Sequence, residues 1–193
     1  MSVILIHEWK EDILYNNILD NHILTFDDAL YSIYYYRNDI SKLLNQKIIC
    51  IPTGRILDKR ISDPIITDCY TANNMWLSNH DNSAYMTIAE IKELIDMGFE
   101  VGGHSHFHEK ETDPRILRIL NINSKLVTRG KKYYEYDTQL MKEWFLNNIG
   151  YIPKYYAFPY NKESPMLKEY LQSQGFEIFF GKERISIDDK QIH

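Results

Sequence analysis

The sequence predicts an α/β fold in which short parallel strands alternate with helices. Apolar, β-branched runs of a few residues recur along the chain, and segments with apolar residues at helical spacing separate them. This alternation is typical of βα units, whose strands lie parallel. The chemically useful residues fall at the ends of predicted strands, where barrels of βα units place their active sites. At 193 residues the length suits one sizeable core, so we expect a single domain over residues 1–193.

The elements predicted for the first half of the chain rest on apolar runs and on helix-capping residues. Strands are expected over residues 3–6, 22–26 and 47–51, the last stopped by Pro52, and a helix over 29–44. The stretch from Arg55 to Tyr85 has no clean period and is expected to be irregular. Thr87 to Glu90 has the pattern of a capping box, which predicts a helix that Gly98 ends.

The second half continues the alternation. A strand over residues 99–103 leads to a helix around 116–120 and a solvated loop at 129–132. A helix over 137–148 is expected to be capped by Asp137 and closed by Gly150. The remaining elements are a strand over 155–158, a helix over 165–175 and a strand over 176–180.

Composition excludes several classes of protein. The chain is 44% hydrophobic and 25% charged, with a net charge of −5, so no basic field would attract nucleic acid. No run approaches the ~20 apolar residues of a membrane span. The N-terminal residues lack the basic start and the length of a signal peptide, and we therefore expect a cytoplasmic protein. Cys50 and Cys69 do not have metal-type spacing, and Cys50 is expected to be a buried free thiol.

The densest chemical signal is a histidine cluster directly after Gly102-Gly103. His104, His106 and His108 would share one face of a continuing strand, whereas a bend after the glycines would pair His104 with His108 and turn His106 away. The glycines favour the bend. Imidazole is the commonest metal ligand, and a pair of them needs at least one further ligand. The alternative is a histidine-rich surface loop.

An acidic pair follows another predicted strand. Asp27 and Asp28 come directly after the strand over residues 22–26. Neighbouring carboxylates in a turning backbone point in different directions, so one suits a metal while the other handles a proton. The alternative is that one of them caps the next helix.

These segments resemble motifs of the polysaccharide deacetylases of the NodB-homology type, also called carbohydrate esterase family four. Thr25-Phe26-Asp27-Asp28 is similar to the first family motif. The segment from His104 to His108 is similar to the second, which has four residues from its first to its last histidine. Ala157-Phe158-Pro159-Tyr160 is similar to the third. The motifs occur in family order, and the resemblance covers most of the chain.

The resemblance implies a distorted (β/α) barrel that holds a divalent metal, with zinc as the expected ion. Asp28, His104 and His108 are the implied ligands, Asp27 is the implied general base, and the backbone N–H of Tyr160 is implied to help form the oxyanion hole.

The resemblance also implies supporting roles. Ser105 would orient a ligand or the loop, Pro159 would support the third motif, and His106 would not bind the metal.

The chain departs from the family pattern at several positions. Ala29 replaces a usual glycine, and Asn161, which tolerates a left-handed backbone, replaces another. Ala157 stands where many members have an arginine that steadies the base, which predicts altered support for Asp27.

The general acid is left unassigned, because the family motif that supplies it is not present. The candidates for this role are His7, His22, His80 and His193.

The expected function is removal of an acetyl group from an N-acetylated sugar or polysaccharide by metal-activated water, with an aspartate base. Two alternatives stay open: a degenerate deacetylase-like protein that only binds carbohydrate, and a metal amidohydrolase acting on a small non-sugar amide. The choice between N- and O-deacetylation and the oligomeric state are also open.

Overall fold

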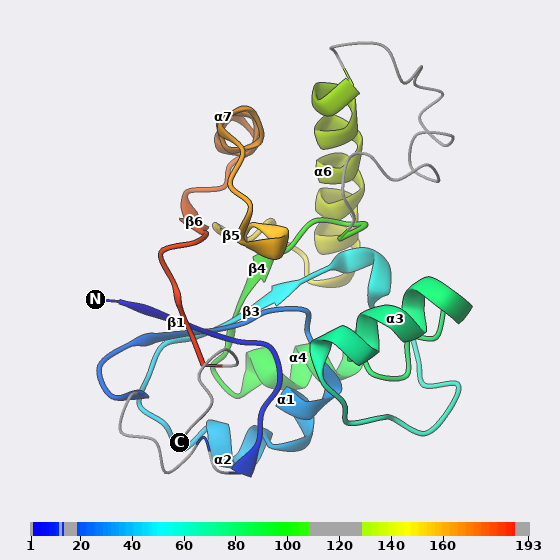
Figure 1. The fold of residues 1–193 in the computed structure, drawn as a ribbon, viewed down its shortest axis with the longest axis vertical. Coiled ribbons are helices and arrows are strands. Elements are labelled where there is room, and N and C mark those ends of the chain that lie inside the picture. The colour runs from blue at the N-terminus through cyan, green and yellow to red at the C-terminus, as the bar shows by residue number, and fades with distance from the viewer. Residues whose placement is uncertain (1, 12, 14–18, 109–128, 188–193) are drawn as a thin grey trace. The chain divides into compact units, whose positions relative to one another are not determined.

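The computed structural model describes residues 2–11, 13, 19–108 and 129–187 (Figure 1). The helix expected around 116–120 and the candidate acid His193 lie outside these residues. The chain forms two compact units. The first unit comprises Met1–Ile51, Arg55–Gly102 and Glu183–His193, and the second comprises Pro52–Gly54 and Gly103–Lys182. The single-domain organisation stays a prediction.

The first unit is built on parallel strands. Its elements are β1 (Val3–Ile6), β2 (Ile23–Phe26), β3 (Lys47–Ile51), β4 (Glu100–Gly103, whose last residue lies in the second unit) and β7 (Ile185–Ser186). The strand order is β4-β3-β2-β1-β7.

The pairings of β1 with β2, of β2 with β3 and of β1 with β7 are all parallel. Leu5, Leu24 and Ile48 are at most 2% exposed, as expected for strands covered on both faces. The predicted α/β class is therefore confirmed. β7 was not predicted, because a strand of two residues carries no readable pattern.

The helices of the first unit correct two expectations. They are α1 (Tyr31–Tyr35), α2 (Arg37–Ile40), α3 (Cys69–Asn79) and α4 (Ile88–Asp96). The single helix expected over 29–44 is wrong: Asp28 and Ala29 have positive φ, so the helix starts later, and it breaks at Tyr36.

α3 lies inside the stretch that was expected to be irregular. Asp68 caps it by accepting a hydrogen bond from the Thr71 N–H at 2.8 Å. α3 buries only Ala72, and its sequence has no apolar stripe that would predict a helix.

The capping box of α4 is confirmed. The Thr87 hydroxyl accepts from the Glu90 N–H at 3.2 Å, and the Glu90 carboxylate accepts from the Thr87 N–H at 2.7 Å. Gly98, at φ 90°, follows the helix and allows the chain to turn into β4.

The second unit contains β5 (Tyr155–Ala157), which pairs in parallel with β6 (Ile178–Phe180). Its helices are α6 (Arg129–Asn148), η4 (Pro159–Asn161) and α7 (Pro165–Ser173), and η3 (Thr53–Arg55) starts in it. α7 has its proline in the first turn, as predicted, and its N-terminus is capped by Ser164.

α6 corrects the expectation of a solvated loop over 129–132 and of an Asp137 cap. The helix already begins at Arg129, and Asp137 lies in its interior. Tyr133, Asp137, Met141 and Phe145 are spaced four apart and are at most 4% exposed. The buried stripe therefore runs through an aspartate, which interrupts the apolar pattern and made the helix look shorter than it is.

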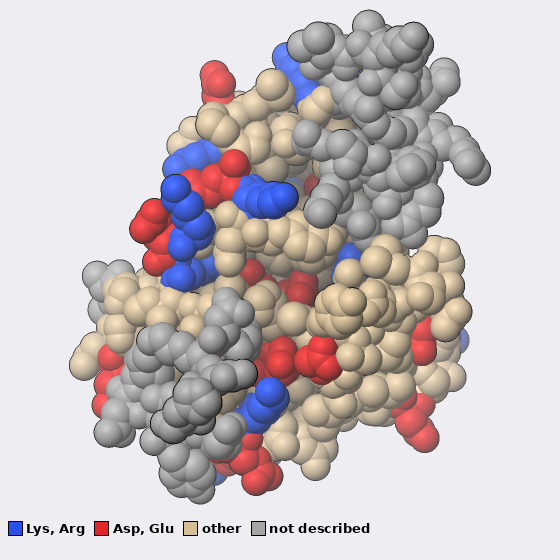
Figure 2. All heavy atoms as spheres, viewed as in Figure 1, with Lys and Arg blue, Asp and Glu red and all other residues tan. Residues whose placement is uncertain are grey.

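The described part of the chain contains no helix long and apolar enough to span a membrane. On the face drawn in Figure 2, acidic and basic side chains of the described residues lie interspersed.

Candidate functional site

In the first unit, the turn after β2 presents the acidic pair. Asp27 and Asp28 are 1% and 7% exposed. Asp28 and Ala29 both have positive φ, at 68° and 51°, a conformation that costs on the order of 1–3 kcal/mol for a residue other than glycine. Such strain is concentrated at functional sites. The capping interpretation is wrong, since Leu30 is the N-cap of α1 and no side chain caps it.

Asp27 is held by Arg184. The guanidinium donates to both carboxylate oxygens at 2.8 Å, and both side chains are 2% exposed. The same guanidinium donates to the Thr25 hydroxyl at 3.1 Å, which in turn donates to the Ile4 carbonyl oxygen at 2.9 Å. Burial works to lower the pKa of Arg184, but the charge of Asp27 and its hydrogen bonds, together with the nearby Cys50 and Asp28, raise that pKa.

Sequence reasoning missed Arg184 altogether. Arg184 directly precedes the two-residue strand β7, and no motif contains it. In the sequence, the one sign of Arg184 is that an ionisable residue stands beside a short apolar run. Arg184 supplies to Asp27 the cation that Ala157 cannot supply.

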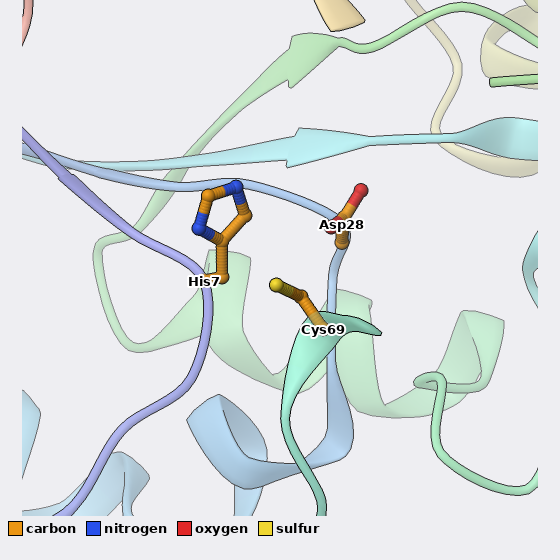
Figure 3. Close-up of side chains that lie close together, drawn as sticks. All are labelled: His7, Asp28 and Cys69. Atoms are coloured by element: carbon orange, nitrogen blue, oxygen red, sulfur yellow. The ribbon is translucent and has the colours of Figure 1, made fainter. Parts of the chain in front are cut away.

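A second cluster in this unit joins Asp28 to His7 and Cys69, and Figure 3 shows the three side chains lying close together. His7 follows β1, and Cys69 is the first residue of α3. Their potential ligand atoms all lie within 4.8 Å of one another.

The histidines of the first unit can now be distinguished. His22 lies 2.6 Å from the Ser2 hydroxyl through Nδ1, and His80 is exposed at the end of α3, against Trp76. His7 is the one that approaches the acidic pair among the described residues of this unit.

In the second unit, His104 and His108 face each other. Their Nε2 atoms are 3.1 Å apart, and the residues are 2% and 6% exposed. Nδ1 of His104 is 2.8 Å from the Ala157 carbonyl oxygen. A carbonyl only accepts, so Nδ1 carries the proton and Nε2 keeps its lone pair.

This geometry fits a shared metal. Two imidazole nitrogens on one tetrahedral zinc at about 2.0–2.1 Å lie about 3.3 Å apart, close to the observed 3.1 Å between the Nε2 atoms. A ligating histidine commonly donates its other ring N–H to a backbone carbonyl, as His104 does to Ala157.

Asp137 organises the backbone between the two histidines. Its carboxylate accepts from the Ser105 hydroxyl at 2.8 Å, the His106 N–H at 3.0 Å and the Phe107 N–H at 2.9 Å. The Ser105 oxygen then accepts from the His108 N–H at 3.1 Å. Burial raises the pKa of Asp137 against the opposing effect of these hydrogen bonds.

The loop that Asp137 holds is strained. Ser105 and His108 both have positive φ, at 68° and 54°. Sequence reasoning assigned Asp137 to a helix cap and so missed this contact; an aspartate on the buried side of a helix was the available signal.

His106 is directed elsewhere. Its Nδ1 lies 2.9 Å from the Thr53 hydroxyl, and its carbonyl accepts from the Gly54 N–H at 2.9 Å. A side chain at position 54 would come within 2.6 Å of that carbonyl oxygen. Burial lowers the pKa of His106 to about 4, so the ring is neutral at pH 7. Because β4 ends at Gly103, the interpretation of three histidines along a strand face is wrong.

The third motif forms η4, directly after β5. Tyr160 and Asn161 have φ of 58° and 53°, a left-handed backbone that asparagine tolerates better than most residues. The Tyr160 hydroxyl donates to the His108 carbonyl at 3.1 Å, and the two rings lie 5.0 Å apart. Pro159 starts η4 and sets the direction of this turn.

The predicted site residues are thus divided between the units. Asp27 and Asp28 lie in the first, and His104, Ser105, His108, Pro159 and Tyr160 lie in the second. The first unit presents a buried carboxylate pair with a bound guanidinium. The second presents two imidazoles arranged to share a cation.

No protein-family model matches the sequence, and no curated protein sequence matches it either. Solved structures do. A de-N-acetylase from Aggregatibacter actinomycetemcomitans is 14% identical over 96% of this chain and 77% of that chain, with a TM-score of 0.61. IcaB from Ammonifex degensii is 18% identical over 95% and 78%, with a TM-score of 0.58.

A third structure, the BpsB deacetylase domain from Bordetella bronchiseptica, is 17% identical over 86% of this chain and 69% of that chain, with a TM-score of 0.55. At such identities the likeness is one of fold. The chain therefore has an α/β fold of the polysaccharide deacetylase type, as its sequence predicts.

Proposed function

We propose that the protein is a metal-dependent hydrolase that removes the acetyl group of an N-acetylated sugar or polysaccharide, acting on a carbon–nitrogen bond other than a peptide bond. The observation that carries the proposal is the pair of Nε2 atoms of His104 and His108, 3.1 Å apart, with the His104 tautomer set by the Ala157 carbonyl. The deacetylase-type fold and the buried Asp27–Asp28 pair support it.

Asp28, His104 and His108 are the proposed ligands of a divalent cation, with zinc as the expected ion. The donor set fits: two imidazoles and one carboxylate is a common catalytic zinc set that keeps one position open. When bound there, the ion supplies a water of lowered pKa and polarises the acetyl oxygen.

Three other residues are assigned to the proton transfers and to stabilising the oxyanion. Asp27, oriented by Arg184, accepts the proton of the attacking water. The backbone N–H of Tyr160 donates to the oxyanion, a contribution worth ~3 kcal/mol in other acyl-transfer enzymes. His7 gives a proton to the leaving nitrogen as the carbon–nitrogen bond breaks. The products are acetate and a free amine.

His7 and Arg184 also bear on the carbohydrate-binding alternative. That alternative rested on the missing arginine at Ala157 and on the missing acid. Arg184 bonds to Asp27, and His7 lies beside Asp28, so both missing functions have candidates in the first unit.

The test measures bound metal and acetate release from chitooligosaccharides. The parent is expected to bind about one zinc per chain and to release acetate. Asp28→Ala and His104→Ala release no acetate and lose the zinc held by the His104–His108 pair, whereas Asp27→Asn keeps that zinc and loses at least about 10²-fold in rate. His22→Ala, a change at the other end of β2, serves as the control and matches the parent.

Different results identify the alternatives. Glycan binding without turnover under any divalent metal would establish a binding protein. Turnover of short acyl amides or of O-acetyl esters, with chitooligosaccharides untouched, would identify a different substrate class. An active parent that contains no metal would refute the mechanism.

His106→Ala is expected to leave the metal content unchanged, because the ring bonds to Thr53 through Nδ1 and does not face the Nε2 pair. The variant loses about 1–2 kcal/mol of unfolding free energy, as is typical for removing a partly buried, hydrogen-bonded side chain. Metal analysis and urea unfolding measure the two effects. Loss of metal in His106→Ala, with metal retained in Asp28→Ala, would reverse the assignment of ligands.

A further inference from the structure

We propose that His7, Asp28 and Cys69 form a second metal-ligand set, which takes a thiophilic divalent cation such as zinc and inhibits the enzyme when that cation is in excess. The inhibitory effect rests on the proposed function, because it arises from competition for Asp28. The binding itself does not, since the three ligands lie entirely in the first unit.

The three side chains converge from separate segments of this unit. His7 follows β1, Asp28 follows β2, and Cys69 begins α3 (Figure 3). Each offers one ligand atom, and all of these atoms lie within 4.8 Å of one another. Asp28 is 7% exposed and the other two are of intermediate exposure, so the cluster is shielded and still accessible to an ion.

The donor types select the class of cation. A thiolate with an imidazole and a carboxylate suits zinc and its thiophilic relatives, whereas magnesium and calcium prefer sets made only of oxygen. Ligands of one tetrahedral ion lie about 3.3–3.8 Å apart. The potential ligand atoms lie within 4.8 Å of one another, so side-chain movements of about 1 Å bring them into that range.

The backbone around Cys69 is tied to the segment that carries His7. The Cys69 N–H donates to the Glu8 carboxylate at 3.4 Å, and Glu8 follows His7 directly. Asp68 fixes the first turn of α3 through the Thr71 N–H. The thiol is thereby placed at the start of a capped helix, where a negative sulfur is favoured by the backbone dipoles.

The other cysteine provides a natural contrast. Cys50 is fully buried in β3, and burial raises the pKa of its thiol well above the ordinary value. When the cation binds, Cys69 releases its thiol proton to solvent and the sulfur becomes a ligand, with no change in oxidation state. Cys69 is therefore the thiol that we expect to bind metal.

Occupancy of this set interferes with the proposed reaction in two ways. It withdraws the Asp28 carboxylate from His104 and His108, and it occupies the His7 ring nitrogen that would donate a proton. Zinc is then required at low concentration and inhibitory in excess.

The test titrates Co²⁺ into the metal-free full chain and follows the thiolate-to-cobalt charge-transfer absorption. The parent is expected to show this band. Cys69→Ser abolishes it, His7→Ala weakens Co²⁺ binding at this band by at least about tenfold, and Cys50→Ser retains it. Equal urea midpoints for parent and Cys69→Ser verify that the variant is folded.

His104→Ala/His108→Ala separates this inference from the proposed function. That variant lacks the catalytic pair and still shows the band if the second set exists. A band that is absent from the parent, persists in Cys69→Ser or disappears in Cys50→Ser would overturn the inference. In activity assays, Cys69→Ser is expected to abolish inhibition by excess Zn²⁺; inhibition equal to that of the parent would overturn the inhibitory role.

Discussion

Arg184→Met is expected to lower the free energy of unfolding by about 3–5 kcal/mol, because it removes one partner of a buried ion pair. Both side chains of the pair are 2% exposed, and the contact is bidentate at 2.8 Å. The variant leaves the Asp27 charge in a low-dielectric site without the guanidinium that compensates it. Urea unfolding at pH 7 measures the loss.

Two variants test whether the ion pair is the cause. Asp27→Asn/Arg184→Met removes both charges and should recover a large part of the stability, since a buried pair replaced as a unit costs little. Lys42→Met disrupts the exposed Lys42–Asp39 pair, whose side chains are 73% and 40% exposed, and should change stability by less than about 1 kcal/mol. If the double variant were as unstable as Arg184→Met, packing of the arginine stem would explain the loss instead.

The same change affects the proposed catalysis. Without a neighbouring cation, the pKa of a buried carboxyl rises, because both burial and the lost attraction disfavour its charged form. A base must be deprotonated, so the acidic limb of the kcat/KM profile is expected to move to higher pH in Arg184→Met. Arg184→Lys keeps the charge and loses the bidentate contact. Its acidic limb should therefore lie between those of the parent and of Arg184→Met. Parent and Arg184→Met with coincident limbs would show that Arg184 does not tune Asp27.

Asp137→Ala is expected to lower the free energy of unfolding by about 2–4 kcal/mol, because a buried carboxylate that accepts from Ser105, His106 and Phe107 is lost. The same bonds set the loop between His104 and His108, so metal affinity should fall about 10–100-fold. Urea unfolding and competition with a metal chelator measure the two effects.

Asp39→Ala is the control for Asp137→Ala. Asp39 is also an aspartate in a helix, but its side chain is 40% exposed and pairs with Lys42 at 2.7 Å. The free energy of unfolding should change by less than about 1 kcal/mol, and the metal affinity should stay the same. An Asp137→Ala protein that binds metal with parental affinity would show that the loop keeps its geometry without this carboxylate.

The sequence determined the α/β class, most strand positions, the capping box at Thr87 and the strand ends at which the candidate site residues lie. These follow from short-range rules: buried strands need continuous apolar runs, caps need particular residues at fixed spacing, and left-handed turns favour residues such as Asn161. The deacetylase-type motifs are local for the same reason. Each lies within a few residues of one strand end.

Only the tertiary structure decided the partners of those motifs. Arg184 reaches Asp27 from a segment 157 positions away, and Asp137 reaches the histidine loop from the buried side of α6. Neither contact leaves a mark in the local pattern, because a buried charge is placed by the chain that surrounds it and not by its neighbours in sequence. His7 and Cys69 meet Asp28 for the same reason. The sequence predicted which residues would carry the chemistry, and the fold decided which side chains contact them.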